Sequence, residues 1–510
     1  MTALATAALT HGIERAGALI VALLAAGLLA LVLTRAQRAL LAGAALVLTP
    51  VLLAIALWHN RKLATLHHHP LRGVVAIAAV VVVVAALAWL FDRRPQLLPL
   101  FALATLPFRI PLGKVSDGLL LPLYAVIAAG TVVLIVREHG RDRAPGLVER
   151  LLALALVLYA LQALYSPSGA SLLKAVENIG FFYVPFALLF FQLRRIDWTP
   201  ELLRRGLWVL LAFALLFVLV GLGELADGSR LLFNGALDQD ARVVRINSLF
   251  YDPNVYGRFL ALTMILLAGA MLAERRPRLA AGAGVALALM WVGLLFSLSE
   301  SSLVALLAGL GTAAVLFAHN RRRALAGAGA ITLAAAVLAL VFASGSIPSS
   351  LGGSGHSLGD ATSGRTSLVS GGFDLFKARP LAGYGSGSFS QEYLASIPHV
   401  PNPFERHEHL PYIEPTTSDS HATPITIAAE QGLIGLAVYL ALLAACFWRL
   451  FAGRRRPARI AVAAAFTGLV VHTLFYADFL EDPATWVLLA VGVALAAAAS
   501  PAAVASPAAA

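Results

Sequence analysis

Long apolar runs, separated by short polar gaps, make up most of the chain. Residues 16–34, 73–91 and 324–359 contain no Asp, Glu, Lys or Arg. A hydrocarbon core of about 30 Å requires roughly 20 apolar residues in a helix, so each run is long enough to cross it. The pattern predicts an all-α, polytopic membrane protein.

About 14 transmembrane helices are predicted from these runs. The fourth is short and has Pro107 near its end, which leaves a total of 14 or 15 and leaves the side of the N-terminus open. The predicted spans are residues 16–34, 38–58, 73–91, 96–108, 118–136, 147–165, 173–193, 206–222, 251–272, 279–298, 302–319, 324–343, 425–448, 460–477 and 483–500.

Composition agrees with a membrane protein: 59% of residues are hydrophobic, 13% are charged, and the mean hydropathy is +0.82. Soluble proteins are about 45–50% apolar and about 25% charged. The net charge of +11 could suggest nucleic acid. However, the basic residues gather in alternate short gaps, which is typical of cytoplasmic loops, and we expect no nucleic-acid partner. These gaps contain Arg137, Arg141, Arg143, Arg194, Arg195, Arg204, Arg205, Arg275, Arg276, Arg278, Arg321, Arg322, Arg323, Arg454, Arg455, Arg456 and Arg459.

The gaps on the other side are poorer in Lys and Arg for their length, and one of them is long. They indicate an outer surface where polar side chains gather beside spans, and such residues are candidates for function. Cys446 is the only cysteine, so an intrachain disulfide is excluded. The predicted regions are N-terminal transmembrane helices (1–136), central transmembrane helices (137–343) with an outer loop (223–250), a large extracytoplasmic loop (344–421), C-terminal transmembrane helices (422–500) and a disordered tail (501–510).

The first candidate cluster precedes the span that begins near residue 251. Asp252-Pro253 is typical of a helix N-cap followed by proline at the first helical position. The free N–H groups at such a start favour anions. Arg242 and Arg245 come shortly before it, as anion ligands or as ordinary interfacial arginines.

The second cluster lies in the long outer loop, which the positive-inside rule would leave poor in arginine. Arg365 precedes SLVSGGFDLF, a predicted short helix, and the segment GYGSGSF, which we expect to form a turn that lets the loop fold back. Alone, Arg365 favours a solvated loop arginine over a binding residue. Together with Arg245 it forms a candidate pair for one diphosphate.

The third cluster is TTSDSHATP, at the end of that loop. Thr423-Pro424 predicts another N-cap and helix start, with His421 just before it. The positive end of the helix disfavours added positive charge, so we expect a neutral imidazole that accepts a proton, with Asp419 holding its other nitrogen. A surface histidine bonded to water is the alternative.

In this order, the three clusters resemble the O-antigen ligase and polymerase superfamily of bacterial envelope glycosyltransferases, over roughly residues 200–490. RINSLFYDPN is similar to the family's arginine and helix start, PLAGYGSGSF to its glycine-rich segment, and the stretch from His421 to Gly435 to its histidine with a following E.G..G. The matching residues are Arg245, Phe250, Pro253, Asn254, Arg365, Pro380, Leu381, Gly383, Gly385, Gly387, Phe389, His421, Glu430, Gly432 and Gly435.

This resemblance implies a GT-C-like enzyme in the bacterial cytoplasmic membrane with its active site on the periplasmic side. It implies transfer of a glycan from an undecaprenyl-diphosphate-linked oligosaccharide to a glycan or lipid-glycan acceptor. No cofactor or metal is expected. Its other expected contacts are membrane lipids and a chain-length regulator. The expected catalytic base is His421, and the expected substrate-binding residues are Arg245, Arg365, Arg242 and Asn254.

Two departures and several alternatives stay open. The family often has Asn where this chain has Ala422, and Ser-Arg where it has Ser299-Glu300, which leaves the role of Glu300 undecided. These residues do not separate a ligase from a polymerase. A transporter or lipid flippase is the alternative from another class, although no acidic pair is expected within a span. A metal site in ERHEHLPYIE is disfavoured because adjacent ligands cannot easily surround an ion.

Overall fold

The computed structural model describes residues 2–58, 70–109, 119–137, 140–141, 143–228, 231–232, 245–274, 276–318, 365–397, 419–452 and 456–498. Every regular element in these ranges is helical. The elements are α1 (Thr2–Ala30), α2 (Arg35–Ala56), α4 (Pro70–Arg93), α5 (Leu97–Thr105), α6 (Leu121–Val136), α7 (Leu147–Ala163), α8 (Ala170–Glu177), the π-helical turn η2 (Asn178–Tyr183), α9 (Val184–Arg194), α10 (Pro200–Asp227), α11 (Pro253–Ala273), α12 (Pro277–Ser297), α13 (Glu300–Phe317), α16 (Arg365–Ala378), α17 (Phe389–Ser396), α18 (Thr423–Phe451), α19 (Pro457–Thr473) and α20 (Pro483–Ala497).

Nine helices in the described ranges are long and apolar enough to cross a membrane, and α6, α19 and α20 are shorter apolar helices. This confirms an all-α polytopic membrane protein. The predicted seventh span is a continuous run of α8, η2 and α9, and the short fourth span corresponds to α5. The predicted span 324–343 lies outside the described residues, so the total of about 14 and the GT-C-like arrangement stay predictions.

Proline marks the start of several spans, and the residue before it often caps the helix. The Thr199 side chain accepts a hydrogen bond from the backbone of Leu202, and Asp482 accepts one from Ala484. Proline at a helix start loses no hydrogen bond, because the first N–H groups have no partner within the helix. Most helix boundaries lie within a few residues of those predicted, but α1 begins at Thr2 and α10 at Pro200, before the predicted residues 16 and 206.

A buried ion pair joins helices at one of the basic ends. In it, Arg194 at the end of α9 donates to the Glu149 carboxylate at the start of α7, at 2.9 Å. Both side chains are almost fully buried, so each charge depends on the other for compensation. The pair holds the ends of α7 and α9 together.

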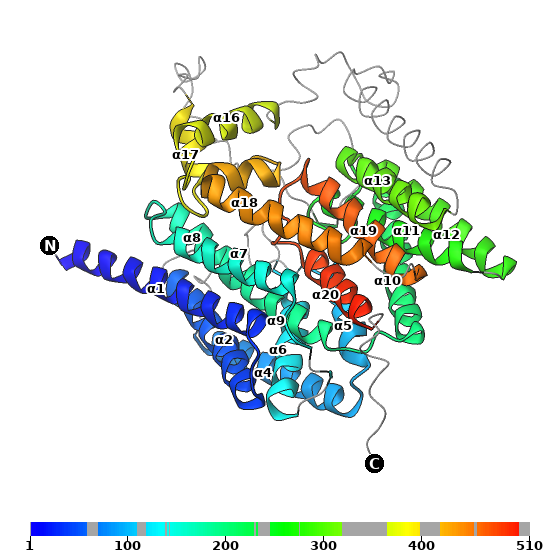
Figure 1. Ribbon diagram of the computed structural model, residues 1–510, viewed down its shortest axis with the longest axis horizontal. Coiled ribbons are helices and arrows are strands. Elements are labelled where there is room, and N and C mark those ends of the chain that lie inside the picture. The colour runs from blue at the N-terminus through cyan, green and yellow to red at the C-terminus, as the bar shows by residue number, and fades with distance from the viewer. Residues whose placement is uncertain are drawn as a thin grey trace.

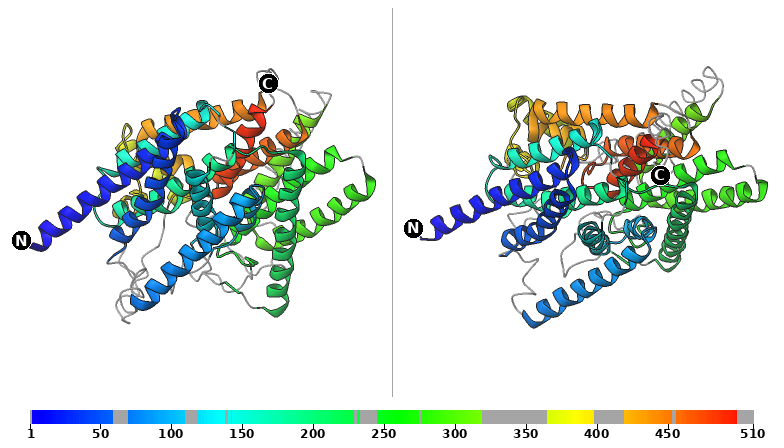
Figure 2. Two further views of the ribbon diagram at one scale, coloured as in Figure 1. Left: turned by 90° about the horizontal axis from the view of Figure 1, so that it is seen from below. Right: turned by 60° about the horizontal axis from the view of Figure 1, so that its bottom comes forward.

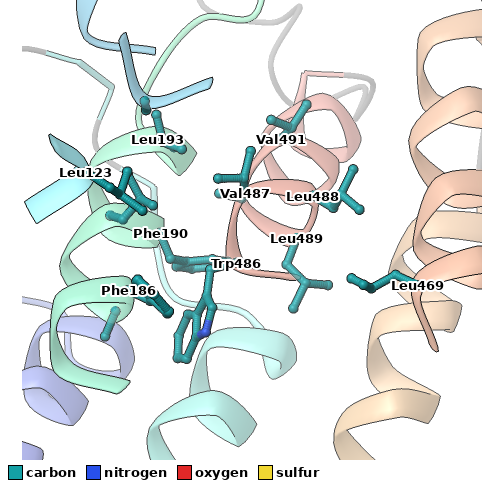
Figure 3. Close-up of a cluster of buried hydrophobic side chains, with 14 of the residues drawn as sticks. Leu123, Phe186, Phe190, Leu193, Leu469, Trp486, Val487, Leu488, Leu489 and Val491 are labelled. Atoms are coloured by element: carbon teal, nitrogen blue, oxygen red, sulfur yellow. The ribbon is translucent and has the colours of Figure 1, made fainter. Parts of the chain in front are cut away.

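Large apolar side chains fill the centre, where α20 packs between α9 and α19. Trp486 is fully buried, and its ring meets that of Phe190 edge-on at 6.3 Å between centroids. Phe186 lies beside this pair, with Leu469 of α19 on the far side of α20 (Figure 3). α20 is therefore an internal helix that anchors the segment preceding it.

The remaining helices surround this centre. α1 and α12 lie at opposite ends of the molecule in every view (Figures 1 and 2). α16 and α17, from the long loop, lie together on α18 (Figure 1). The predicted short helix SLVSGGFDLF is confirmed, as part of α16.

α18 is interrupted at Gly432, whose φ of 64° and ψ of −161° lie outside the helical region. Helix residues after such a break have N–H groups without partners in the preceding turn. Residues 380–389, the glycine-rich turn, supply carbonyls instead. The N–H of Leu433 donates to the carbonyl of Pro380 at 2.7 Å, and the next N–H bonds the following carbonyl at 3.3 Å.

The carbonyls before the break are paired in the same way. The backbone of Tyr384 donates to Ala429 at 3.2 Å, and that of Gly385 donates to Glu430 at 2.8 Å. A Cβ on Gly383 would lie 2.3 Å from the Glu430 carbonyl oxygen, so only glycine permits this approach. The expectation that this segment folds back as a turn is confirmed.

The Glu430 side chain adds a second layer to this junction. Its two carboxylate oxygens accept the N–H groups of Gly387 at 2.9 Å and Phe389 at 3.0 Å. Glu430 is buried, and the two hydrogen bonds pair both of its side-chain oxygens. The glycine-rich turn is thus held to α18 through backbone and side chain together.

Gly432→Ala tests this junction. A Cβ there would lie 2.4 Å from the Leu381 carbonyl oxygen at a positive φ, so we expect a loss of about 2 kcal/mol or more and a Tm several degrees lower. Gly284→Ala is the matched control, because a Cβ at that α12 position meets nothing within 4 Å. Thermal unfolding in detergent measures both, and equal Tm values would contradict the prediction.

Candidate functional site

The start of α11 is organised by Asp252. One carboxylate oxygen accepts the backbone N–H of Asn254 at 2.7 Å, and the other accepts the hydroxyl of Tyr476. This confirms the predicted cap and the proline at the first helical position. It also ties α11 to the segment between α19 and α20, which is far away in the sequence.

Arg245 lies beside this helix start. Its Nε donates to the Ser297 carbonyl at 3.2 Å, and its Nη2 donates to Asn254 Oδ1 at 3.3 Å and to the Leu298 carbonyl at 3.4 Å. These carbonyls end α12, where an arginine stabilises the negative end of the helix. Arg245 and Asn254 therefore contact each other, and the guanidinium is held in place by the protein.

Buried serines pack the turn between α12 and α13 against α11. A Cβ on Gly257 would lie 2.8 Å from Ser302 Oγ, so glycine allows the close approach. Ser302 also donates to the carbonyl of Asn254 at 3.4 Å. Glu300 is the first residue of α13 and is exposed, in a position where a carboxylate favours the positive end of the helix.

His421 has a left-handed backbone with a φ of 55°. Its N–H donates to Asp419 Oδ1 at 2.7 Å, and its Nδ1 lies 3.7 Å from the same oxygen. Asp419 therefore holds the backbone of His421 by a hydrogen bond, and the expected contact with the ring is longer. The predicted N-cap was wrong by one residue: Ala422 is the N-cap and Thr423 already belongs to the helix.

Ser420 is bonded to the first turn of α18. Its hydroxyl and the hydroxyl of Thr426 lie 2.8 Å apart, and its backbone N–H donates to the same Thr426 oxygen at 3.1 Å. These hydrogen bonds join the segment before α18 to its first turn, whereas the N-cap Ala422 makes no side-chain capping bond.

Tyr476 connects the two helix starts. Its ring lies 6.1 Å from that of His421, between centroids, and its hydroxyl donates to Asp252. Burial raises the pKa of Tyr476 well above its usual value, which keeps the hydroxyl protonated as a donor. A continuous series of contacts therefore joins Arg245, Asn254, Asp252, Tyr476 and His421.

Arg258 of α11 contacts both Tyr476 and the start of α20. It forms a buried ion pair with Asp482, 3.0 Å between Nε and Oδ2, and its guanidinium lies 5.7 Å from the centre of the Tyr476 ring. Asp482 is also the N-cap of α20, so one carboxylate orients both a helix start and an arginine. This arrangement fixes Tyr476 between α11 and α20.

The other two predicted arginines are only partly located. Arg365 begins α16, and nothing is described of its side chain. A Cβ on Gly372 of α16 would lie 2.6 Å from Ile425, and Pro380 bonds Leu433. Gly372 thus meets the first turn of α18, and Pro380, which follows α16, meets a residue further along α18. The two segments therefore run in the same direction, and the start of α16 lies toward the start of α18, which His421 precedes. Arg242 lies outside the described residues, as do His407, Glu408 and His409.

Strained backbone gathers around these contacts. In the described ranges, the non-glycine residues with positive φ are Ser248, Leu298, His421 and Asp478. Leu298 contacts Arg245, and Asp478 follows Tyr476 by two residues. Such conformations persist only where surrounding structure holds them, and they often mark functional sites.

Sequence reasoning missed the segment YADFLEDP, residues 476–483. Its three acidic residues and one tyrosine lie in an otherwise apolar C-terminal region, which was the available signal. Within the described residues, no group of three or more His, Cys, Asp or Glu side chains is placed to hold a metal ion.

Burial also changes the ionisation of this segment. It raises the pKa of Glu481 to about 8, opposed by the nearby Lys174 and reinforced by Asp478, Asp419 and Glu430. The pKa of Asp478 is raised for the same reason, with Asp419 adding to the effect. The segment therefore carries less negative charge at neutral pH than its residue types imply.

A family model described as O-Antigen ligase matches residues 285–440. The matched region contains Arg365, the glycine-rich turn, His421 and the junction at Gly432, whereas Arg245 and Asn254 precede it. No curated protein matches the chain. The match supports an O-antigen ligase- or polymerase-type function in general.

Glu481→Gln tests the ionisation. An acid whose pKa is raised by folding binds a proton in the folded state that the unfolded chain has released, so stability falls as the pH rises from about 4.5 to about 8. One proton contributes at most about 1.4 kcal/mol per pH unit. We expect the Tm of Glu481→Gln to fall less than that of the wild type over this range. Asp374→Asn, an exposed carboxylate of α16, is the control, and parallel curves for all three proteins would contradict the assignment.

Proposed function

The chain belongs to the O-antigen ligase/polymerase superfamily, and from this premise we propose that it transfers a glycan from a polyprenyl-diphosphate carrier to an acceptor hydroxyl. The reaction takes place at the outer face of the bacterial cytoplasmic membrane. The transfer proceeds without a metal and inverts the anomeric carbon.

The observation that carries this proposal is the series of contacts from Arg245 through Asp252 and Tyr476 to His421. It brings an arginine and an imidazole from two separate helix starts into one neighbourhood. A diphosphate leaving group and a nucleophilic hydroxyl require such a cation and base on the two sides of one reacting carbon.

Arg245 binds the diphosphate in this proposal, with Asn254 beside it at the start of α11. Charge on the leaving group grows as the bond between the anomeric carbon and the diphosphate oxygen breaks. A guanidinium that is already oriented stabilises this charge without reorganisation. Arg365 and Arg242 are proposed as further ligands of the same anion, since two or more arginines match its charge.

His421 acts as the general base. It accepts the proton of the acceptor hydroxyl as the oxygen bonds to the anomeric carbon, and the carrier diphosphate leaves with the electrons of the broken bond. Attack from the face opposite the leaving group inverts the configuration. Asp419 holds the left-handed backbone that presents the imidazole.

Single substitutions of these residues test the assignment. With the full-length protein in nanodiscs and a polyprenyl-diphosphate-linked glycan as donor, we expect His421→Ala to lower kcat about 100-fold or more. Arg245→Ala should lower kcat/KM for the donor to a similar extent. Arg278→Ala, at the opposite end of α12, is the matched control and should leave both values unchanged.

The same assay tests the metal-free reaction. Added EDTA should leave turnover unchanged, and a loss of turnover with EDTA would overturn this part of the proposal. Near wild-type turnover of His421→Ala would overturn the role of the base. Lengthening of the carrier-linked chain would identify a polymerase, whereas transfer to a separate glycolipid or protein would identify a ligase.

A further inference from the structure

A polar cavity lies close to His421 in the chain, since Asp419 and Thr423 line it. Its walls come from α7, from α8 with η2, from α18 and from residues 477–481. Asp419, which holds His421, is one of the lining residues, so the cavity begins one side chain from the imidazole. Gly435 of α18 also lines it.

The charges of this cavity differ from those around Arg245. Lys174 is its one basic lining residue, whereas four carboxylates line it: Asp419, Glu430, Asp478 and Glu481. With one basic residue, this surface offers few of the cationic donors that a diphosphate requires. Because no metal-binding group of side chains occurs among the described residues, we do not assign it to an ion.

Three buried polar atoms in the walls, on Asn178, Thr423 and Tyr439, have no hydrogen-bond partner among the described residues. Asn178 uses its Nδ2 on Glu481 at 2.7 Å and on the Tyr159 hydroxyl at 2.9 Å, which leaves Oδ1 unpaired. Thr423 Oγ1 is also unpaired, and both residues are more than nine-tenths buried. Buried polar atoms without partners are rare and indicate a water or ligand that completes them.

The mixture of groups matches a sugar ring. Sugar hydroxyls both donate and accept hydrogen bonds, and the cavity offers acceptors in its carboxylates and Asn178, donors in Lys174 and Thr423, and the rings of Tyr159 and Tyr183. Asn178 and Tyr183 belong to the π-helical turn η2, a conformation that often occurs at functional sites. A hydroxyl of a sugar bound here would lie toward Asp419 and His421.

We propose that this cavity binds the terminal sugar of the acceptor glycan, with Glu481, Asp478, Asn178 and Thr423 as its hydrogen-bonding groups. The inference rests on the proposed function for the identity of the second substrate. It separates the site into a cationic part for the donor diphosphate and an acidic part for the acceptor hydroxyls, with His421 between them. The hydroxyl that loses its proton to His421 is supplied from the acidic part.

Saturation-transfer difference NMR tests binding independently of catalysis. The probes are the methyl glycosides of glucose, galactose, mannose and N-acetylglucosamine, with full-length protein in nanodiscs. We expect a signal from at least one glycoside with the wild type, and about a tenfold weaker affinity in Glu481→Gln and Asp478→Asn, because each replaces a carboxyl group that hydrogen-bonds the sugar by an amide with a different set of donors and acceptors. Asp374→Asn is the control and should bind as the wild type does.

Thr423→Val keeps the test decisive if the acidic variants fold poorly. This substitution preserves the shape of the side chain and removes a hydroxyl that bonds nothing in the described protein, so the Tm should be equal or higher. Its glycoside affinity should nevertheless fall. A stable Thr423→Val protein that binds every glycoside as the wild type does, or a wild type that binds none, overturns the inference.

The outcome is distinct from that of the proposed reaction. In the transfer assay, the cavity variants should raise the acceptor KM about tenfold and leave the donor KM unchanged, whereas Arg245→Ala should keep glycoside binding intact. Glycoside binding without transfer would refute the proposed function and support the cavity. Transfer without cavity-dependent glycoside binding would refute the cavity alone.

Discussion

The backbone pairing that closes the break in α18 is the constraint on which the outer face of this protein depends. An unpaired N–H or C=O within an apolar bundle costs several kcal/mol, so a helix can be interrupted there only if another segment supplies partners. The glycine-rich turn supplies them on both sides of Gly432, and the Glu430 carboxylate fixes the turn in return. Neither segment is satisfied without the other.

Several consequences follow for the site. The interruption allows the first part of α18 to take a direction of its own, and α16 lies along it through Gly372 and Ile425. The starts of both helices, and with them His421 and Arg365, are therefore positioned by one junction. The two sequence segments PLAGYGSGSF and E.G..G, which resemble separate family motifs, are the two halves of this structural unit.

The sequence was sufficient for features that depend on neighbouring residues. Apolar runs predicted the helices, and Asp252-Pro253 predicted a helix start, because capping uses groups within three residues. The start of α18 was misplaced by one residue, because the N-cap is Ala422, a residue type that makes no side-chain capping bond and so leaves no capping signal in the sequence. Tyr476 was not predicted as a site residue, because it is linked to the site only through contacts with Asp252 and His421. These residues are distant from it in sequence and meet it only in the folded protein.

In the proposed reaction, a position of His421 between the arginine-bearing start of α11 and the carboxyl-lined cavity has a chemical reason. A diphosphate binds to cationic groups, whereas the hydroxyls of a neutral acceptor bind to carboxyl and amide groups. On one mixed surface the cations would pair with the carboxyl groups, and both substrates would bind poorly. Here Arg245 bonds helix carbonyls and an amide, while Glu481 and Asp478 lie with Lys174 around a separate cavity. His421 and Asp478, which lines the cavity, both have a left-handed backbone, and in the proposed reaction the proton leaves the acceptor at His421 as the donor loses its carrier.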